Sequence, residues 1–188
     1  MRLIGLFAMC VLFTACATPP IFPPEIMKDV ETDATALKSW KEQSYHPSSA
    51  NLVPHKVELG GQIMRVIPKP GGWDLLVAEE PLEKYRWHDF TRVQRKDSFW
   101  YAIALNDFPD PSMLQRGNKL VVVGTTDRAA TEIIGGAQKV LPQLLAQCLH
   151  IWQIDELEAN RFPYGDTVGY FPPESTFCDE SKGGSLSK

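Results

Sequence analysis

The sequence predicts a single, mainly β domain, and three observations lead to that prediction. The chain has 188 residues, which suits one modest domain better than two full-sized ones. It contains 15 prolines, above the usual ~5% of residues, which favours turns and edge strands over a helical bundle. Short apolar runs rich in β-branched and aromatic residues recur between glycine and proline turns, as is typical of strands.

The first residues predict an export signal. Arg2 supplies a positive charge, and Leu3 to Phe13 form an unbroken apolar run. Because this run is shorter than the ~20 residues that a membrane-spanning helix needs, we expect residues 1–15 to be a signal peptide that is removed.

Small residues lead from this run to a cysteine, in the order Phe13-Thr14-Ala15-Cys16. The motif resembles the lipobox of bacterial lipoproteins, with Phe13 where that pattern most often has Leu. The resemblance implies cleavage before Cys16 and acyl chains on its thiol and new amine, which would hold the protein on a membrane. Ala17, rather than Asp, resembles the pattern of lipoproteins exported to the outer membrane. The alternative is an ordinary secretory signal, with Cys16 as a free or disulfide-bonded thiol.

Residues 16–32 are expected to link the anchor to the folded domain. Four prolines between Ala17 and Glu25 exclude a helix interior or a central strand, so we expect an extended spacer that lifts the domain off the lipid. Asp33 to Gln43 then offers an Asp N-cap and apolar residues at helical spacing, which predicts a short helix.

Four segments with strand character follow. Lys56 to Ile67 combines apolar residues with Gly60-Gly61, which predicts a strand with a glycine bulge or a sharp coil. Trp73 to Ala78 predicts a second strand, and the two would form a hairpin. Ser98 to Leu105 and Lys119 to Thr125 predict two more, the latter an apolar run of the kind that is covered on both faces.

The segment from Leu141 to Trp152 fits two patterns. Residues at helical spacing are Leu141, Leu144, Leu145, Cys148, Leu149 and Trp152, whereas Leu144, Ala146, Cys148, His150 and Trp152 alternate as one face of a strand. The residues alone favour the helix. Further on, residues 174–188 are polar and small, which predicts a flexible tail and places the folded domain at residues 33–173.

Two of the four cysteines remain in the folded part once Cys10 leaves with the signal and Cys16 takes lipid. In an oxidising periplasm Cys148 and Cys178 could pair, but a buried unpaired thiol is equally ordinary. The residues leave both alternatives open.

Six short motifs follow one another in the core: Val57 to Ile63, Glu80-Pro81-Leu82, Phe108 to Pro111, Gly117 to Gly124, Ile134-Gly135 and His150-Ile151-Trp152. Their order resembles that of the Slp family of starvation-inducible outer-membrane lipoproteins. The resemblance implies a strand, not a helix, at residues 140–152. The five strands and short N-terminal helix that result are expected to form a small barrel of the oligonucleotide/oligosaccharide-binding (OB) type, or an open antiparallel sheet.

The same resemblance implies a non-enzymatic lipoprotein on the outer membrane, at its periplasmic face, with a structural or interaction role in the cell envelope. Its partner is the membrane itself, through acylated Cys16. A further partner would be an envelope protein, a glycan or a lipid.

The residues predict no catalytic, cofactor or metal site. The four histidines lack metal-ligand spacing, and there is no nucleophile elbow or phosphate loop. A formal net charge of −4 argues against nucleic-acid binding.

Aromatic and basic residues alternate from Lys84 to Tyr101. Tyr85, Arg86 and Trp87 are the candidates there for contacting glycans, lipids or anionic headgroups, which is the alternative function. The competing interpretation is that the aromatic residues lie in the core and the bases are solvated.

Overall fold

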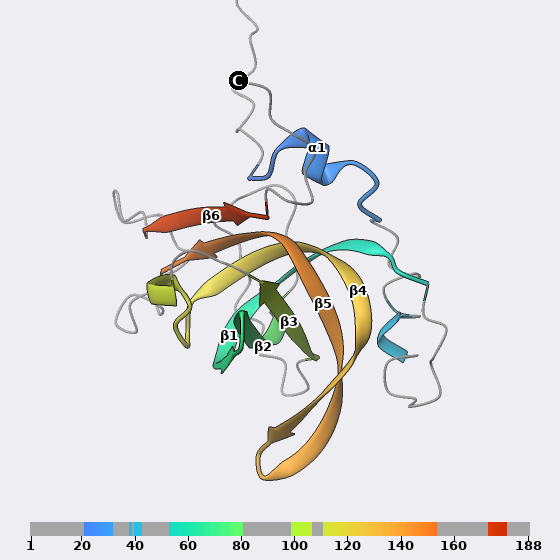
Figure 1. The fold of residues 1–188 in the computed structure, drawn as a ribbon, viewed down its shortest axis with the longest axis vertical. Helices are drawn as coiled ribbons and strands as arrows, with labels where there is room; N and C mark the ends of the chain where they lie inside the picture. The colour runs from blue at the N-terminus through green and yellow to red at the C-terminus, as the bar shows by residue number, and fades with distance from the viewer. Residues whose placement is uncertain are drawn as a thin grey trace, which may run out of the picture.

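The computed structural model describes residues 21–31, 38, 40–42, 53–80, 99–106, 111–153 and 173–179. Its elements are α1 (Pro24–Met27), β1 (Lys56–Lys69), β2 (Gly72–Glu80), β3 (Trp100–Asn106), the 3-10 turn η1 (Pro111–Met113), β4 (Lys119–Ile134), β5 (Ala137–Trp152) and β6 (Glu174–Cys178). One sheet contains all six strands, in the order β3-β2-β1-β4-β5-β6 (Figure 1). The predicted mainly β fold is confirmed.

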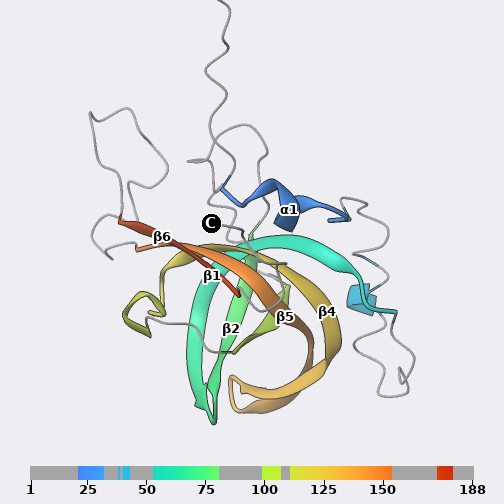
Figure 2. The same cartoon turned by 45° about the horizontal axis from the view of Figure 1, so that its top comes forward.

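The sheet closes on itself because β3 also pairs with β5. This pairing is parallel and runs from Ala102 opposite Gln143 to Ala104 opposite Leu145. The remaining strand pairings are antiparallel. The result is a five-stranded ring in the order β1-β2-β3-β5-β4, the OB-like barrel that the sequence predicts, with β6 added outside the ring on β5 (Figure 2).

Strand β1 pairs with β4 along its first part and with β2 along its second part. Residues 56–62 pair with β4 and residues 60–69 pair with β2, so the strand changes partners around Gly60-Gly61. A Cβ atom on Gly61 would clash with the carbonyl oxygen of Ala78 and the side chain of Val77. The curvature of the barrel at this point therefore requires glycine.

The irregularity of β1 does not lie at the glycines. Its register against β2 shifts between Ile63 and Arg65. The predicted glycine bulge is therefore wrong in position, because Gly61 serves close packing against β2 and the extra residue is accommodated further along the strand.

Alternate side chains of the five strands fill the barrel and form what we call the inner core. Its buried strand residues are Val57, Leu59, Ile63, Leu75, Val77, Tyr101, Ile103, Leu105, Leu120, Val122, Leu144, Ala146, Leu149 and Ile151. Trp40, from the segment before β1, Met113 of η1 and Leu114, the residue after η1, complete it. Burial of side chains of this size stabilises the fold by about 1.5–3 kcal/mol each.

Strand β5 confirms the strand implied for residues 140–152, and it explains why two patterns overlap there. Val123 lies opposite Cys148, but the next residue, Gly124, lies opposite Ala146. Gln147 is thus an inserted residue, and it turns the following part of the strand over. Alternation is interrupted once, so the apolar residues imitate helical spacing.

The hairpin of β4 and β5 continues beyond the barrel. Its free part, residues 126–142, we call the ribbon, and it ends in Gly135 and Gly136, whose φ angles are 60° and 82°. The guanidinium of Arg65 donates to the carbonyl oxygen of Ile133 over 2.9 Å. Ile133 itself is 62% exposed. Because β4 reaches Ile134, it is longer than the strand predicted from Lys119 to Thr125.

Two other predicted segments differ in part. The predicted flexible tail is wrong for Glu174–Cys178, which form β6, because pairing with β5 satisfies their backbone groups. Of the helix predicted from Asp33 to Gln43, residues 38 and 40–42 are helical, and the other residues lie outside the described ranges.

Candidate functional site

The outside of β4 and β5 carries a second apolar cluster, which we call the outer cluster. Its buried members are Phe22, Ile26, Val121, Val123, Cys148 and Trp152, and Ile21, Met27, Val30 and Cys178 pack against them. Val121 and Val123 alternate along β4 with residues of the inner core, and the inserted Gln147 turns Cys148 outward on β5. The same two strands therefore support apolar packing on both faces.

Residues 21–31, which we call the N-terminal segment, cover this outer face. Phe22 and Ile26 are only 2% and 8% exposed. Pro24 occupies the first turn of α1, where the missing N–H costs nothing, and the backbone N–H of Ile26 donates to the carbonyl of Pro23 over 2.9 Å. The single turn places Phe22 and Ile26 on the barrel together.

The end of the N-terminal segment is fastened to the start of β1. The backbone N–H of Glu31 donates to the carbonyl of Lys56 over 2.8 Å, and Glu31 forms a parallel bridge with Val57. The Glu31 carboxylate lies 2.7 Å from Nδ1 of His55, and the Lys56 ammonium donates to the carbonyl of Lys28 over 3.1 Å. The segment is therefore held at both ends.

This packing corrects one prediction. The extended spacer expected from Ala17 to Glu25, which would lift the domain off the lipid, is wrong for residues 21–25, which belong to a segment that lies against the barrel. Prolines do exclude long helices and central strands, but they leave Phe22 and Ile26 free to bury apolar surface on a neighbouring face.

Strand β6 is joined to β5 by a disulfide. Cys148 and Cys178 lie opposite each other in the register, with Cα atoms 4.1 Å apart, and their sulfur atoms are bonded. Cys148 is a buried member of the outer cluster and Cys178 packs at its margin. The disulfide therefore connects the C-terminal strand to the face that the N-terminal segment covers.

His150 lies between Cys148 and Trp152 on this face and is 6% exposed. Its Nδ1 is 2.7 Å from Oγ1 of Thr176, and its Nε2 is 3.5 Å from the carboxylate of Glu174. Its ring meets Trp152 edge-on, with the ring centroids 4.2 Å apart. Burial lowers the pKa of His150, and the nearby Glu174 carboxylate offsets part of that shift. The neutral ring is the form that suits the site.

A second polar group lies near the end of β2. The Lys41 ammonium is 2.6 Å from the Glu79 carboxylate and 4.3 Å from the centre of the Phe99 ring. Glu80 pairs with Lys119 across β1. Burial, and then the charges of Glu79 and Glu80, raise the pKa of Tyr101. This arrangement ties residues 40–42 to the barrel and keeps the phenol protonated.

The sequence-predicted site residues fall into two groups. Cys16, Tyr85, Arg86 and Trp87 lie outside the described residues. Cys148 and Cys178 are brought together. In the part of the chain that the structure describes, no group of His, Cys, Asp and Glu is suited to hold a metal ion. Within the same ranges, no helix is long and apolar enough to cross a bilayer.

Sequence reasoning missed the contribution of the N-terminal segment and of His150. The signal for the segment is present in the sequence, since Ile21, Phe22, Ile26 and Met27 interrupt a run of prolines and charges. The sequence placed His150 on one strand face with Cys148 and Trp152 but gave it no role, because its partners Thr176 and Glu174 lie on β6, a strand that the sequence did not predict.

The fold and this face together define a small, disulfide-bonded β-barrel domain of the OB type. The chain belongs to the outer membrane lipoprotein Slp family, whose model matches residues 13–176. The resemblance noted from the core motifs is thereby confirmed, and the family places the protein at the outer membrane. No curated protein and no solved structure matches the chain.

Proposed function

We propose that acyl chains on Cys16 anchor this protein in the periplasmic leaflet of the outer membrane, and that the N-terminal segment holds the barrel close to that leaflet. The role is structural or interactive and not enzymatic. Cys16 lies within the residues that the family model matches. Two or more buried acyl chains suffice for stable anchoring, whereas one chain binds only reversibly.

The single observation that carries the proposal is the burial of Phe22 so soon after Cys16. Five residue steps separate Cys16 from Ile21, where packing on the barrel begins. An extended chain spans at most about 3.6 Å per residue, so Ile21 stays within about 18 Å of the lipidated residue. The barrel is then positioned by its anchor and does not swing on a long linker.

Metabolic labelling with palmitate tests the anchor. We expect label on the wild type and on Cys10→Ala, and none on Cys16→Ala, because only Cys16 follows the small residues of the lipobox. Cys10→Ala is the matched control, since Cys10 lies within the segment that cleavage removes. Equal labelling of Cys16→Ala and the wild type would refute the proposal.

Inhibition of the lipoprotein signal peptidase with globomycin gives a second readout. We expect an uncleaved precursor to accumulate for the wild type in treated cells. In cell fractionation of untreated cells, we expect the mature wild type in the outer-membrane fraction and Cys16→Ala outside that fraction. If globomycin leaves cleavage of the signal peptide unchanged, Cys16 is not lipidated before cleavage and the proposal is contradicted.

A further inference from the structure

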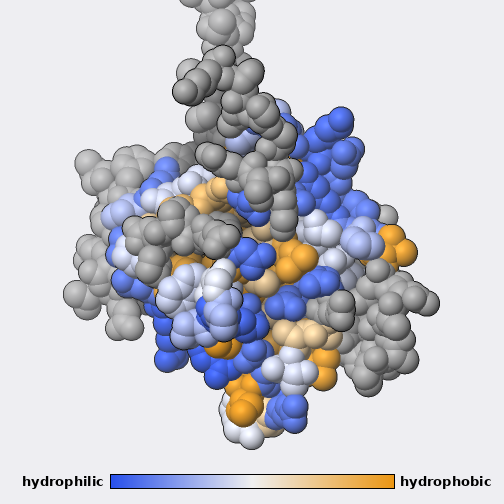
Figure 3. Space-filling view, viewed as in Figure 1, coloured by the Kyte–Doolittle hydropathy of each residue, from blue (hydrophilic) through white to orange (hydrophobic). Residues whose placement is uncertain are grey.

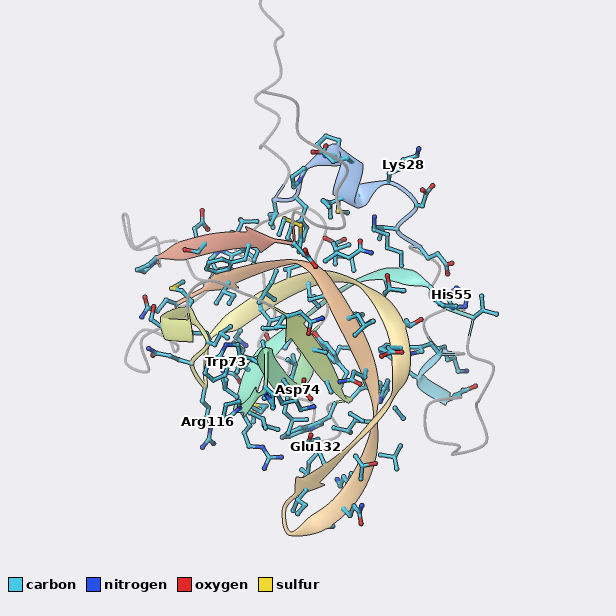
Figure 4. All side chains as sticks on the ribbon, viewed as in Figure 1. Lys28, His55, Trp73, Asp74, Arg116 and Glu132 are labelled. Carbon is cyan, nitrogen blue, oxygen red and sulfur yellow. A yellow bond between two sulfur atoms is a disulfide. The ribbon has the colours of Figure 1, made fainter. Side chains whose placement is uncertain are left out.

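The N-terminal segment and the ribbon lie at opposite ends of the molecule. In both ribbon views α1 and β6 lie on one side of the barrel, and the turn of the β4–β5 hairpin lies on the other (Figure 1, Figure 2). Lys28, beside α1, and Glu132, on the ribbon, lie on these two sides of the barrel (Figure 4). The ribbon curls back toward β1, because the guanidinium of Arg65 lies 3.3 Å from the Glu132 carboxylate and donates to the carbonyl oxygen of Ile133.

The anchor can reach only one of these ends. Ile21 lies within about 18 Å of Cys16, by the reach of an extended chain. Ile21 belongs to the outer cluster, which also contains Cys178 of β6. We infer that the end formed by α1 and β6 faces the phospholipid leaflet and that the ribbon points away from it. This inference rests on the proposed function, because it requires acylated Cys16.

The charge of this end indicates how it meets the leaflet. Glu25, Lys28, Asp29 and Glu31 are exposed, which gives three carboxylates against one ammonium. The space-filling view shows hydrophilic residues at the upper right, on the side of the molecule where α1 lies in Figure 1 (Figure 3). An acidic surface is not drawn to anionic lipids. The chain between acylated Cys16 and Ile21 therefore sets the orientation. The end formed by α1 and β6 lies at the headgroups and does not insert into the leaflet.

The opposite end is left open to the periplasm. There Ile133 is 62% exposed, on a two-stranded ribbon that extends past the last pairing with β1. In the orientation inferred here, the turns of the β4–β5 and β1–β2 hairpins lie on the side of the barrel away from the leaflet (Figure 2).

Fluorescence quenching in vesicles tests the orientation. Acylated full-length protein is reconstituted into phosphatidylethanolamine vesicles that contain a headgroup-labelled nitroxide lipid. A dye is attached to Glu25→Cys, Glu174→Cys or Lys139→Cys under non-reducing conditions, which preserve the Cys148–Cys178 disulfide. We expect more than about half of the fluorescence to be lost for the first two variants, whose dyes the tether keeps near the headgroups, and little for Lys139→Cys.

The outcomes separate the inference from the proposed function. If the acylated wild type fails to float with the vesicles, the proposed function is wrong. If it floats but the dye of Lys139→Cys is quenched as strongly as that of Glu25→Cys, the inferred orientation is wrong. Added phosphatidylglycerol is expected to leave the pattern unchanged, and stronger quenching with anionic lipid would contradict a tether-set orientation.

A variant that undocks the N-terminal segment provides a further control. Ile26→Asp places a charge in the outer cluster, which frees residues 21–31 and lengthens the tether by that segment. In this background, flotation is expected to persist while quenching of the dye of Glu174→Cys falls. Unchanged quenching would show that something other than the docked segment orients the barrel.

Discussion

The inner core and the outer cluster use the same two strands, β4 and β5, yet they are assembled differently. The inner core is drawn mainly from the five strands of the ring, whose hydrogen bonds already hold them together. The outer cluster joins strand residues to the N-terminal segment and to Cys178 of β6. The barrel thus has the means to fold by itself, whereas the outer cluster depends on three separate parts of the chain.

The inner core closes the barrel, and the outer cluster attaches the N-terminal segment and β6 to it. A closed ring leaves few strand edges exposed, which suits a protein concentrated at a membrane surface. Under the proposed function, the outer cluster sets where the chain from acylated Cys16 joins that ring. Substitutions on the two faces of β5 should therefore have separable effects: inner substitutions lower global stability, and outer ones loosen the attached segments.

The largest effect is expected for Leu149→Ala. Leu149 is fully buried in the inner core, so the substitution removes packed methyl groups and leaves a cavity, at a cost of about 4 kcal/mol. Urea denaturation followed by tryptophan fluorescence measures the loss. A cost below about 1 kcal/mol would indicate that the barrel interior is loosely packed.

The second-largest effect is expected when the disulfide is removed. The double variant Cys148→Ala/Cys178→Ala opens a link between residues 30 apart, which is expected to cost about 3 kcal/mol. The loss should fall on β6 first, seen as faster amide exchange at Phe177 than at Leu120. Uniform loss of protection across the barrel would mean that β6 and the ring unfold as one unit.

A smaller loss is expected for Ile26→Ala. Ile26 is the buried residue of the one-turn helix α1 and is 8% exposed. Its truncation should lower the free energy of unfolding by about 2 kcal/mol. Cleavage within residues 21–31 by limited proteolysis should become faster, while the barrel stays intact. The neighbouring exposed residue supplies the control, since Glu25→Ala is expected to change stability by less than about 0.5 kcal/mol.

The smallest effect concerns pH. Burial lowers the pKa of His150, so as the pH falls through ~6.5 the unfolded chain takes up a proton that the folded chain resists. The stability due to the neutral ring is present above that pH and is lost below it, with a slope of at most about 1.4 kcal/mol per pH unit. His150→Gln should flatten the profile of unfolding free energy between pH 7 and pH 5. Identical slopes for the two proteins would rule out His150 as the cause.

The sequence predicted the inner core better than the outer cluster, for physical reasons. Lys119 to Thr125 has a continuous apolar run and lies in the barrel as β4, so local pattern and final structure agree there. The N-terminal segment gains its stability only from contact with strands distant in sequence, which composition does not reveal. Its prolines leave room only for the single turn of α1 and indicate nothing about burial.

Strands β5 and β6 illustrate two other limits. The inserted Gln147 breaks the alternation of β5, so the residues alone favoured a helix and only family resemblance indicated a strand. Glu174 to Cys178 carries few apolar residues and becomes a strand because β5 offers it an edge. Among the candidate site residues, the pair Cys148 and Cys178 was identified, but the sequence alone left their pairing open.

The inserted Gln147 also determines which change in the length of β5 the barrel can accept. Deleting Gln147 would restore simple alternation and keep Leu149 and Ile151 inside the barrel and Cys148 outside it. Deleting His150 would instead turn Ile151 to the outside and Trp152 into the barrel. Loss of Gln147 should therefore be tolerated better than loss of His150, and matched deletions in both strands near Gly135 would only shorten the ribbon.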